Sequence, residues 1–96
     1  MNNDTAIKTP SYKASTNHLY SEIGNEAVIL DLASGTYYGL NEVGVDLWQW
    51  LQEPKTEETI LQLLLSKYDV NLETARQDFQ NILEEMLAAG LVEIVD

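Results

Sequence analysis

The chain has 96 residues, which fits one domain with a modest hydrophobic core. It contains no cysteine, which excludes disulfides, thiolate zinc sites and iron–sulfur clusters, so stability must come from packing. Sixteen acidic residues against five basic ones give a formal net charge of −11, and such a field repels the phosphate backbone of nucleic acids.

The N-terminal region carries no targeting signal that we can identify. Residues 1–10 lack the apolar stretch of a secretory signal, and no run of about 18 apolar residues occurs anywhere. We therefore expect a cytoplasmic protein with no membrane partner. Residues 1–17 are polar, contain Pro10 and show neither a helical nor a strand period, which predicts a flexible N-terminal arm before a domain at 18–96.

Three short strands are predicted after this arm. Residues 18–23 alternate apolar and polar side chains, Gly24-Asn25 supplies a turn, and residues 26–32 are rich in β-formers, a pattern typical of a hairpin. Ala33-Ser34-Gly35 then predicts a second turn, and residues 36–40 a third strand.

Three helices are predicted next. Asn41 is a favourable N-cap for a helix that Pro54 stops at about residue 53, and Gly44 within it indicates close packing. Thr56 can cap a second helix, and the apolar stripe of residues 71–89 predicts a third. Gly90 suits the end of that helix, and residues 91–95 can add an extended segment.

Strands and helices are segregated along the chain, which predicts an α+β fold with a three-stranded antiparallel sheet packed on three helices. Three strands cannot close a barrel. One edge strand must therefore keep unpaired backbone groups, which the protein either protects or uses.

No set of residues predicts catalysis. His18 is the only histidine, so a histidine-based metal site or catalytic triad lacks partners. The carboxylates of Glu84 and Glu85 diverge on a helix, which is typical of a solvated face. Gly35, Gly39 and Gly44 do not have the spacing of a nucleotide-binding loop. We therefore expect no catalytic residue, no metal and no cofactor.

A sheet followed by helices also fits a winged-helix regulator that binds DNA. In the region that would read DNA, residues 71–89, Arg76 is the only basic residue beside four acidic ones. This charge disfavours a nucleic-acid partner. An acidic winged-helix regulator and a subunit that recognises folded protein surfaces remain the alternatives.

One stretch of the sequence resembles a known family. The residues that carry the likeness are Asp31, Gly35, Tyr37-Tyr38, Gly39-Leu40-Asn41, Gly44 and Leu47-Trp48, in one order and spacing. They resemble the PqqD-like family, the small leader-peptide recognition domains of ribosomal peptide modification pathways. The likeness covers about residues 18–95.

The resemblance implies a winged-helix-like fold and a function in peptide binding. Such a protein would bind the leader segment of a ribosomally made precursor peptide by strand addition and present it to a separate modifying enzyme, without catalysing a reaction. The length and the motif of this chain look most like those of the leader-binding proteins of lasso-peptide pathways, whose partner is a leader peptidase. A radical S-adenosylmethionine (SAM) enzyme is the next partner that the resemblance implies.

The resemblance also implies a binding site made of the third strand and the first half of the third helix. Its candidate residues are Thr36, Tyr37, Tyr38, Gly39, Leu40, Leu72, Ala75, Arg76, Phe79 and Leu83. Arg76 could meet an acidic leader residue, whereas Phe79 and Leu83 fit the core at least as well. If the Tyr38 amide bonds to the peptide, Tyr38→Pro should abolish binding.

Overall fold

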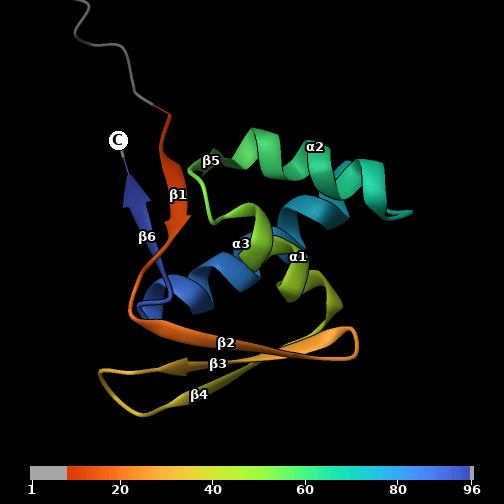
Figure 1. Ribbon diagram of the computed structural model, residues 1–96. Helices are drawn as coiled ribbons and strands as arrows, with labels where there is room; N and C mark the ends of the chain where they lie inside the picture. Colours follow the sequence, from red (N-terminus) through yellow and green to blue (C-terminus); the bar gives the residue numbers. More distant parts are fainter. Residues whose placement is uncertain (1–8, 96) are drawn as a thin grey trace, which may run out of the picture.

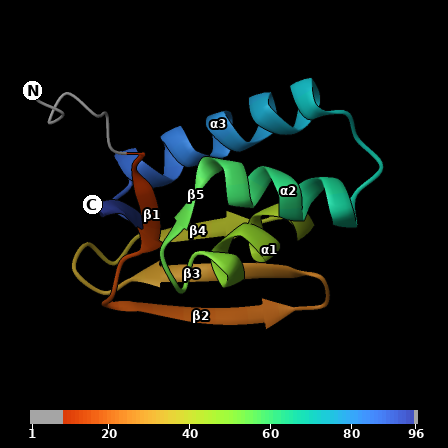
Figure 2. The same cartoon turned by 90° about the horizontal axis from the view of Figure 1, so that it is seen from above.

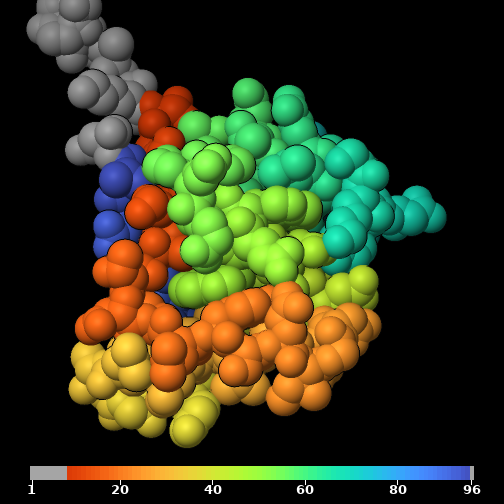
Figure 3. All heavy atoms as spheres, viewed as in Figure 1, coloured from red at the N-terminus to blue at the C-terminus, as the bar shows by residue number. Residues whose placement is uncertain are grey.

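The computed structural model describes residues 9–95, which form three helices and two three-stranded sheets (Figure 1). In chain order the elements are β1 (Ser11–Ala14), β2 (His18–Ile23), β3 (Glu26–Asp31), β4 (Tyr37–Leu40), α1 (Glu42–Trp50), β5 (Lys55–Thr56), α2 (Glu57–Lys67), α3 (Leu72–Ala88) and β6 (Val92–Val95). The predicted α+β class is confirmed. The helices lie on one side of the sheet formed by β2, β3 and β4 (Figures 1 and 3).

The sheet of β2, β3 and β4 is antiparallel, with β3 in the middle. The predicted hairpin between β2 and β3 is confirmed, and Gly24 turns it with a φ of 66°, a conformation that glycine adopts without a steric cost. Along β3, Ala27 and Ile29 are buried against the helices, while Val28 and Leu30 alternate to the outer face. This sheet is the one that the sequence predicted.

The second sheet has the order β5, β1, β6 and corrects the predicted arm. Strand β1 lies within the segment expected to be flexible, and its Ala14 is buried opposite Val92 of β6. Tyr12 of β1 meets the ring of Phe79 edge-on, with centroids 6.3 Å apart. Four residues are too few to show a strand period, and the partners of β1 lie far along the chain. Residues 1–8 of the predicted arm lie outside the described residues.

One hydrophobic core joins both sheets to the helices. Its most deeply buried large side chains are Phe79, Ile29, Leu47, Leu51 and Ile60. Trp48 is buried as well, and the His18 ring lies edge-on to it with a side chain only 6% exposed. The lone histidine is therefore a packing residue at the margin of the core.

The predicted helix ends are confirmed at several positions. Asn41, Thr56 and Asn71 each accept a hydrogen bond from the backbone N–H three residues later, at 2.9, 3.2 and 2.8 Å. Helix α1 ends at Trp50, before Pro54 requires it. Gly90 follows α3 with a φ of 74°, and the Leu91 N–H then bonds to the Met86 carbonyl at 2.9 Å.

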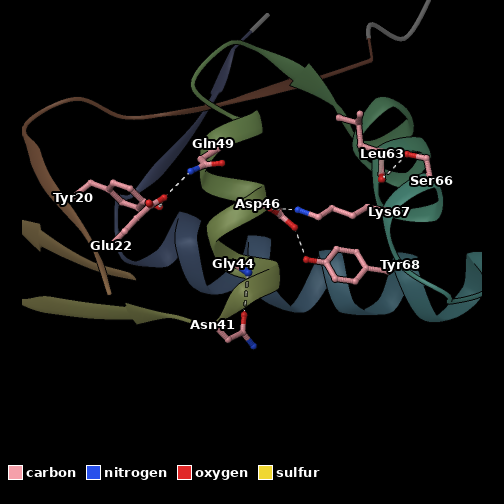
Figure 4. A network of polar contacts seen from close by, with 10 residues as sticks. All are labelled: Tyr20, Glu22, Asn41, Gly44, Asp46, Gln49, Leu63, Ser66, Lys67 and Tyr68. Atoms are coloured by element: carbon pink, nitrogen blue, oxygen red, sulfur yellow. Dashed lines mark hydrogen bonds and ion pairs between the residues drawn. The ribbon is translucent and has the colours of Figure 1, made fainter. Parts of the chain in front are cut away.

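A buried carboxylate connects α1 to the end of α2 (Figure 4). Asp46 is 7% exposed, and its two oxygens accept hydrogen bonds from Lys67, at 2.8 Å, and from the hydroxyl of Tyr68. These bonds replace the water that the carboxylate loses on folding. Burial, followed by the hydrogen bond to Asp46, raises the pKa of Tyr68 above its ordinary value of 10.0.

Replacement of Tyr68 by phenylalanine is expected to lower the free energy of unfolding by about 1.5 kcal/mol at neutral pH, because a hydrogen bond to a buried charge is lost. Because the pKa of Tyr68 is higher in the folded state, its hydrogen bond to Asp46 stabilises the fold fully below pH 10.0, the ordinary pKa of tyrosine. This stabilisation is lost as the pH rises through the pKa of Tyr68 in the folded state. The difference from wild type should therefore shrink in alkaline denaturant titrations. Tyr37→Phe is the control, and equal losses from both variants would contradict the role of the Asp46 bond.

Candidate functional site

A tight turn at residues 31–35 connects β3 to β4. The Oδ1 atom of Asp31 accepts the Ala33 N–H at 3.0 Å, and Oδ2 accepts the Ser34 hydroxyl at 2.9 Å. The Ser34 bond, followed by the Ala33 N–H, lowers the pKa of Asp31 below its usual value. Gly35 completes the turn with a φ of 74°. The Asp31-Ser34-Gly35 part of the sequence motif therefore builds this turn.

The turn also determines which backbone groups of β4 are free. The Asp31 N–H donates to the Thr36 carbonyl at 2.9 Å, so the backbone groups of Thr36 face β3. Because these groups alternate along a strand, those of Tyr38 and Leu40 bond to β3, and those of Tyr37 and Gly39 point outward. No described strand pairs with that outer edge of β4. The Tyr38→Pro test required the Tyr38 N–H to be free for the peptide, and this N–H instead bonds to β3. Gly39, whose N–H points outward, is therefore the better position for a proline substitution.

Side chains of β4 alternate as predicted. Tyr37 is 69% exposed on the outer face of the sheet, whereas the Tyr38 ring is half-buried on the inner face and packs against the core. A Cβ added to Gly39 would meet nothing within 4 Å. The outer edge of β4 is thus open in its backbone, and the outer face of the sheet has free space beside Gly39.

Helix α1 approaches the end of β4 closely. A Cβ built on Gly44 would lie 3.3 Å from two side-chain atoms of Leu40 and 3.4 Å from Oδ1 of Asn41. The Gly44 N–H donates to that same Asn41 oxygen (Figure 4). The close packing predicted at Gly44 is confirmed, and it places the start of α1 against β4.

A groove runs between β4 and α3. It consists of two hollows of about 250 and 260 Å³ that share Asn41 and Ile82. The residues that line this β4–α3 groove are Gly39, Leu40, Asn41, Val43, Gly44, Asp78, Asn81, Ile82 and Glu85. A further hollow of about 320 Å³ lies at the junction of β3 and β4 and also contacts Gly39 and Leu40. The β4 edge therefore borders hollows on more than one side.

The sequence-predicted residues of α3 do not line this groove. Ala75, Phe79 and Leu83 are buried in the core. Leu72 and Arg76 line a separate hollow that α3 shares with α2. The helix is rotated so that Ile82 and Glu85 line the hollow that contains Gly39 and Leu40 of β4, and Asp78 and Asn81 line the one that contains Asn41 and Val43 at the start of α1. Figure 2 shows α3 from above, with the strands of the sheet below it.

The five predicted residues of the third strand, unlike those of α3, lie at or beside the predicted sheet edge. Thr36 precedes β4, and Tyr37, Tyr38, Gly39 and Leu40 form it. The structure therefore brings these residues together at one sheet edge, beside a groove whose α3 side was not predicted from the sequence. The i, i+3, i+4, i+7 spacing of residues 78, 81, 82 and 85 is a helical face that could have indicated it.

The charges around the groove are acidic. Arg76 lies 3.9 Å from both Glu57 and Glu73, and Lys67 contacts Asp46.

Between residues 9 and 95, no three His, Cys, Asp or Glu side chains gather in a way that could hold a metal ion. Across the same part of the chain, no helix has both the length and the apolar character to cross a bilayer.

Comparisons with known proteins identify the family to which this chain belongs. The sequence matches the family described as Coenzyme PQQ synthesis protein D (PqqD) over residues 26–92, from the start of β3 to the start of β6. A comparison with curated proteins finds no match. Among solved structures, the chain is similar to "TbiB1 in Complex with the TbiA(beta) Leader Peptide", with 33% identity and a TM-score of 0.77 over 84% of this chain and 94% of that one. The family match spans β4 and all three helices, and the chain belongs to the PqqD family.

Proposed function

We propose that this protein binds the leader segment of a ribosomally made precursor peptide as an added strand on β4. The observation that carries the proposal is the unpaired outer edge of β4 beside the β4–α3 groove. The similarity to TbiB1, which was solved with the TbiA(beta) leader peptide, supports it. The C-terminal strand β6 pairs with β1 and leaves β4 free.

Strand addition suits a flexible leader peptide. The outward N–H and C=O groups of Tyr37 and Gly39 can each bond to the incoming backbone, which sets its register without reading its sequence. Alternate peptide side chains then enter the β4–α3 groove and the hollow at the junction of β3 and β4. The contacts must also offset the entropy lost when the peptide becomes ordered.

The bound leader would hold the rest of the precursor near a separate modifying enzyme. Such tethering raises the effective concentration of the precursor at that active site without any new contact. We favour a lasso-type leader peptidase as the partner, with a radical SAM enzyme next. In this proposal the chemistry belongs to the partner, and the protein is a non-catalytic accessory subunit.

A titration of isotopically labelled protein tests the proposal. The probe is the synthetic leader of the precursor encoded beside the gene, and shifts are expected at residues 36–41 and 78–85. Duplex DNA serves as the control ligand. Shifts centred on the hollow of α2 and α3, or binding to DNA that falls steeply with salt, would refute leader binding at β4.

A further inference from the structure

The β4–α3 groove has an apolar middle and acidic ends. Ile82 is half-buried and lines both of its hollows, and Leu40 lies across from it on β4. Glu85 lines the hollow that contains Leu40, and Asp78 lines the other. Both carboxylate residues are exposed. The groove therefore presents negative charge on each side of an apolar contact.

Neither carboxylate is neutralised by the described part of the chain. Between residues 9 and 95, no ion pair involves Asp78 or Glu85. The basic side chains Lys55, Lys67 and Arg76 instead contact acidic residues elsewhere. An approaching peptide thus meets two unpaired carboxylates along one wall of the groove.

The spacing of the two carboxylates suits an extended peptide. Residues 78 and 85 are two helical turns apart, a rise of roughly 10 Å. In an added strand, side chains on one face recur about every 6.8 Å. A residue that contacts Ile82 therefore has neighbours two positions away on each side that point toward Asp78 and Glu85. Lysine and arginine have the length to close the remaining distance.

We propose that the groove selects leader segments in which an apolar residue is flanked, two positions away on each side, by lysine or arginine. This inference rests on the proposed strand addition at β4. It reverses the charge preference that Arg76 suggested in the sequence, because Arg76 lies beside α2 and Glu57 instead. Each exposed pair is expected to change affinity by about fivefold at low salt and less at high salt.

A peptide library tests the inference without knowledge of the natural leader. Random short peptides displayed on yeast are sorted with the full chain and with an Asp78→Asn, Glu85→Gln double variant. The wild-type pool should be enriched in the basic-x-apolar-x-basic pattern, and the double variant should lose that enrichment. A Glu84→Gln, Glu93→Gln variant is the matched control, since it removes the same charge from exposed positions that do not line the groove.

The outcomes separate the charge preference from strand addition itself. If the selected peptides bind through β4, so that Gly39→Pro abolishes their binding, but show no basic enrichment, the charge preference is wrong and strand addition stands. The charge preference is also wrong if the control variant loses the enrichment as fully as the double variant. If no peptide depends on Gly39, both proposals fail.

Discussion

Replacement of Gly39 by proline is expected to abolish leader binding, with a rise in Kd of about 100-fold or more. Proline removes the outward N–H of Gly39 and places a ring where the incoming strand must lie, so more than one main-chain bond of about 1 kcal/mol is lost. The internal ladder should survive, because the backbone groups of Gly39 do not bond to β3. Isothermal titration with the leader peptide measures the change.

Gly39→Ala is the matched control for this variant. It keeps the N–H, and its Cβ would meet nothing within 4 Å, so affinity and thermal stability should both stay near wild type. Circular dichroism melts confirm that the proline variant is folded. If folded Gly39→Pro binds the leader as wild type does, β4 is not the docking edge.

Replacement of Phe79 by alanine is expected to have the largest effect on stability, a loss of about 3–5 kcal/mol in the free energy of unfolding. Phe79 is 1% exposed, and its ring also contacts Tyr12 of the second sheet. The deletion therefore opens a cavity and loosens the contact between β1 and α3. Because small domains are stable by only about 5–15 kcal/mol, much of the protein could unfold on mild heating. Urea denaturation followed by fluorescence measures the loss.

A milder variant separates a core role from a binding role. Phe79→Leu keeps the site apolar and should cost about 1 kcal/mol, so the protein stays folded. Since Phe79 does not line the β4–α3 groove, the affinity of this variant for the leader should be unchanged. A tenfold weaker affinity in folded Phe79→Leu would restore Phe79 as a binding residue.

The sequence predicted the elements that depend on local signals. The Gly24 turn, the Asn41 and Thr56 caps and the Gly90 helix end each arise from neighbouring residues, and all are present. The second sheet could not be predicted in this way. Its strand β1 pairs with β6, which lies near the opposite end of the chain, and four residues carry no distinctive period.

The candidate site also consists of one part that local signals predict and one part that depends on distant contacts. The β4 edge was predicted, because the strand follows directly from the turn at Asp31 and Gly35. The α3 side was not, because the apolar stripe of that helix is wide enough to allow more than one rotation about its axis. The packing of Phe79 against Tyr12 and the core selects the rotation, and Tyr12 belongs to β1, the strand that was not predicted from the sequence.

The pairing of β1 with β6 has a consequence for the order in which the protein is made. The strands β2, β3 and β4 and the helix α1 lie between residues 18 and 50, and the pairings among these strands are short in sequence. The pairing of β1 with β6 closes a long loop and has to wait until β6 has left the ribosome. We expect the free edge of β4 to form early during synthesis, and the pairing of β1 with β6 to complete the fold afterwards.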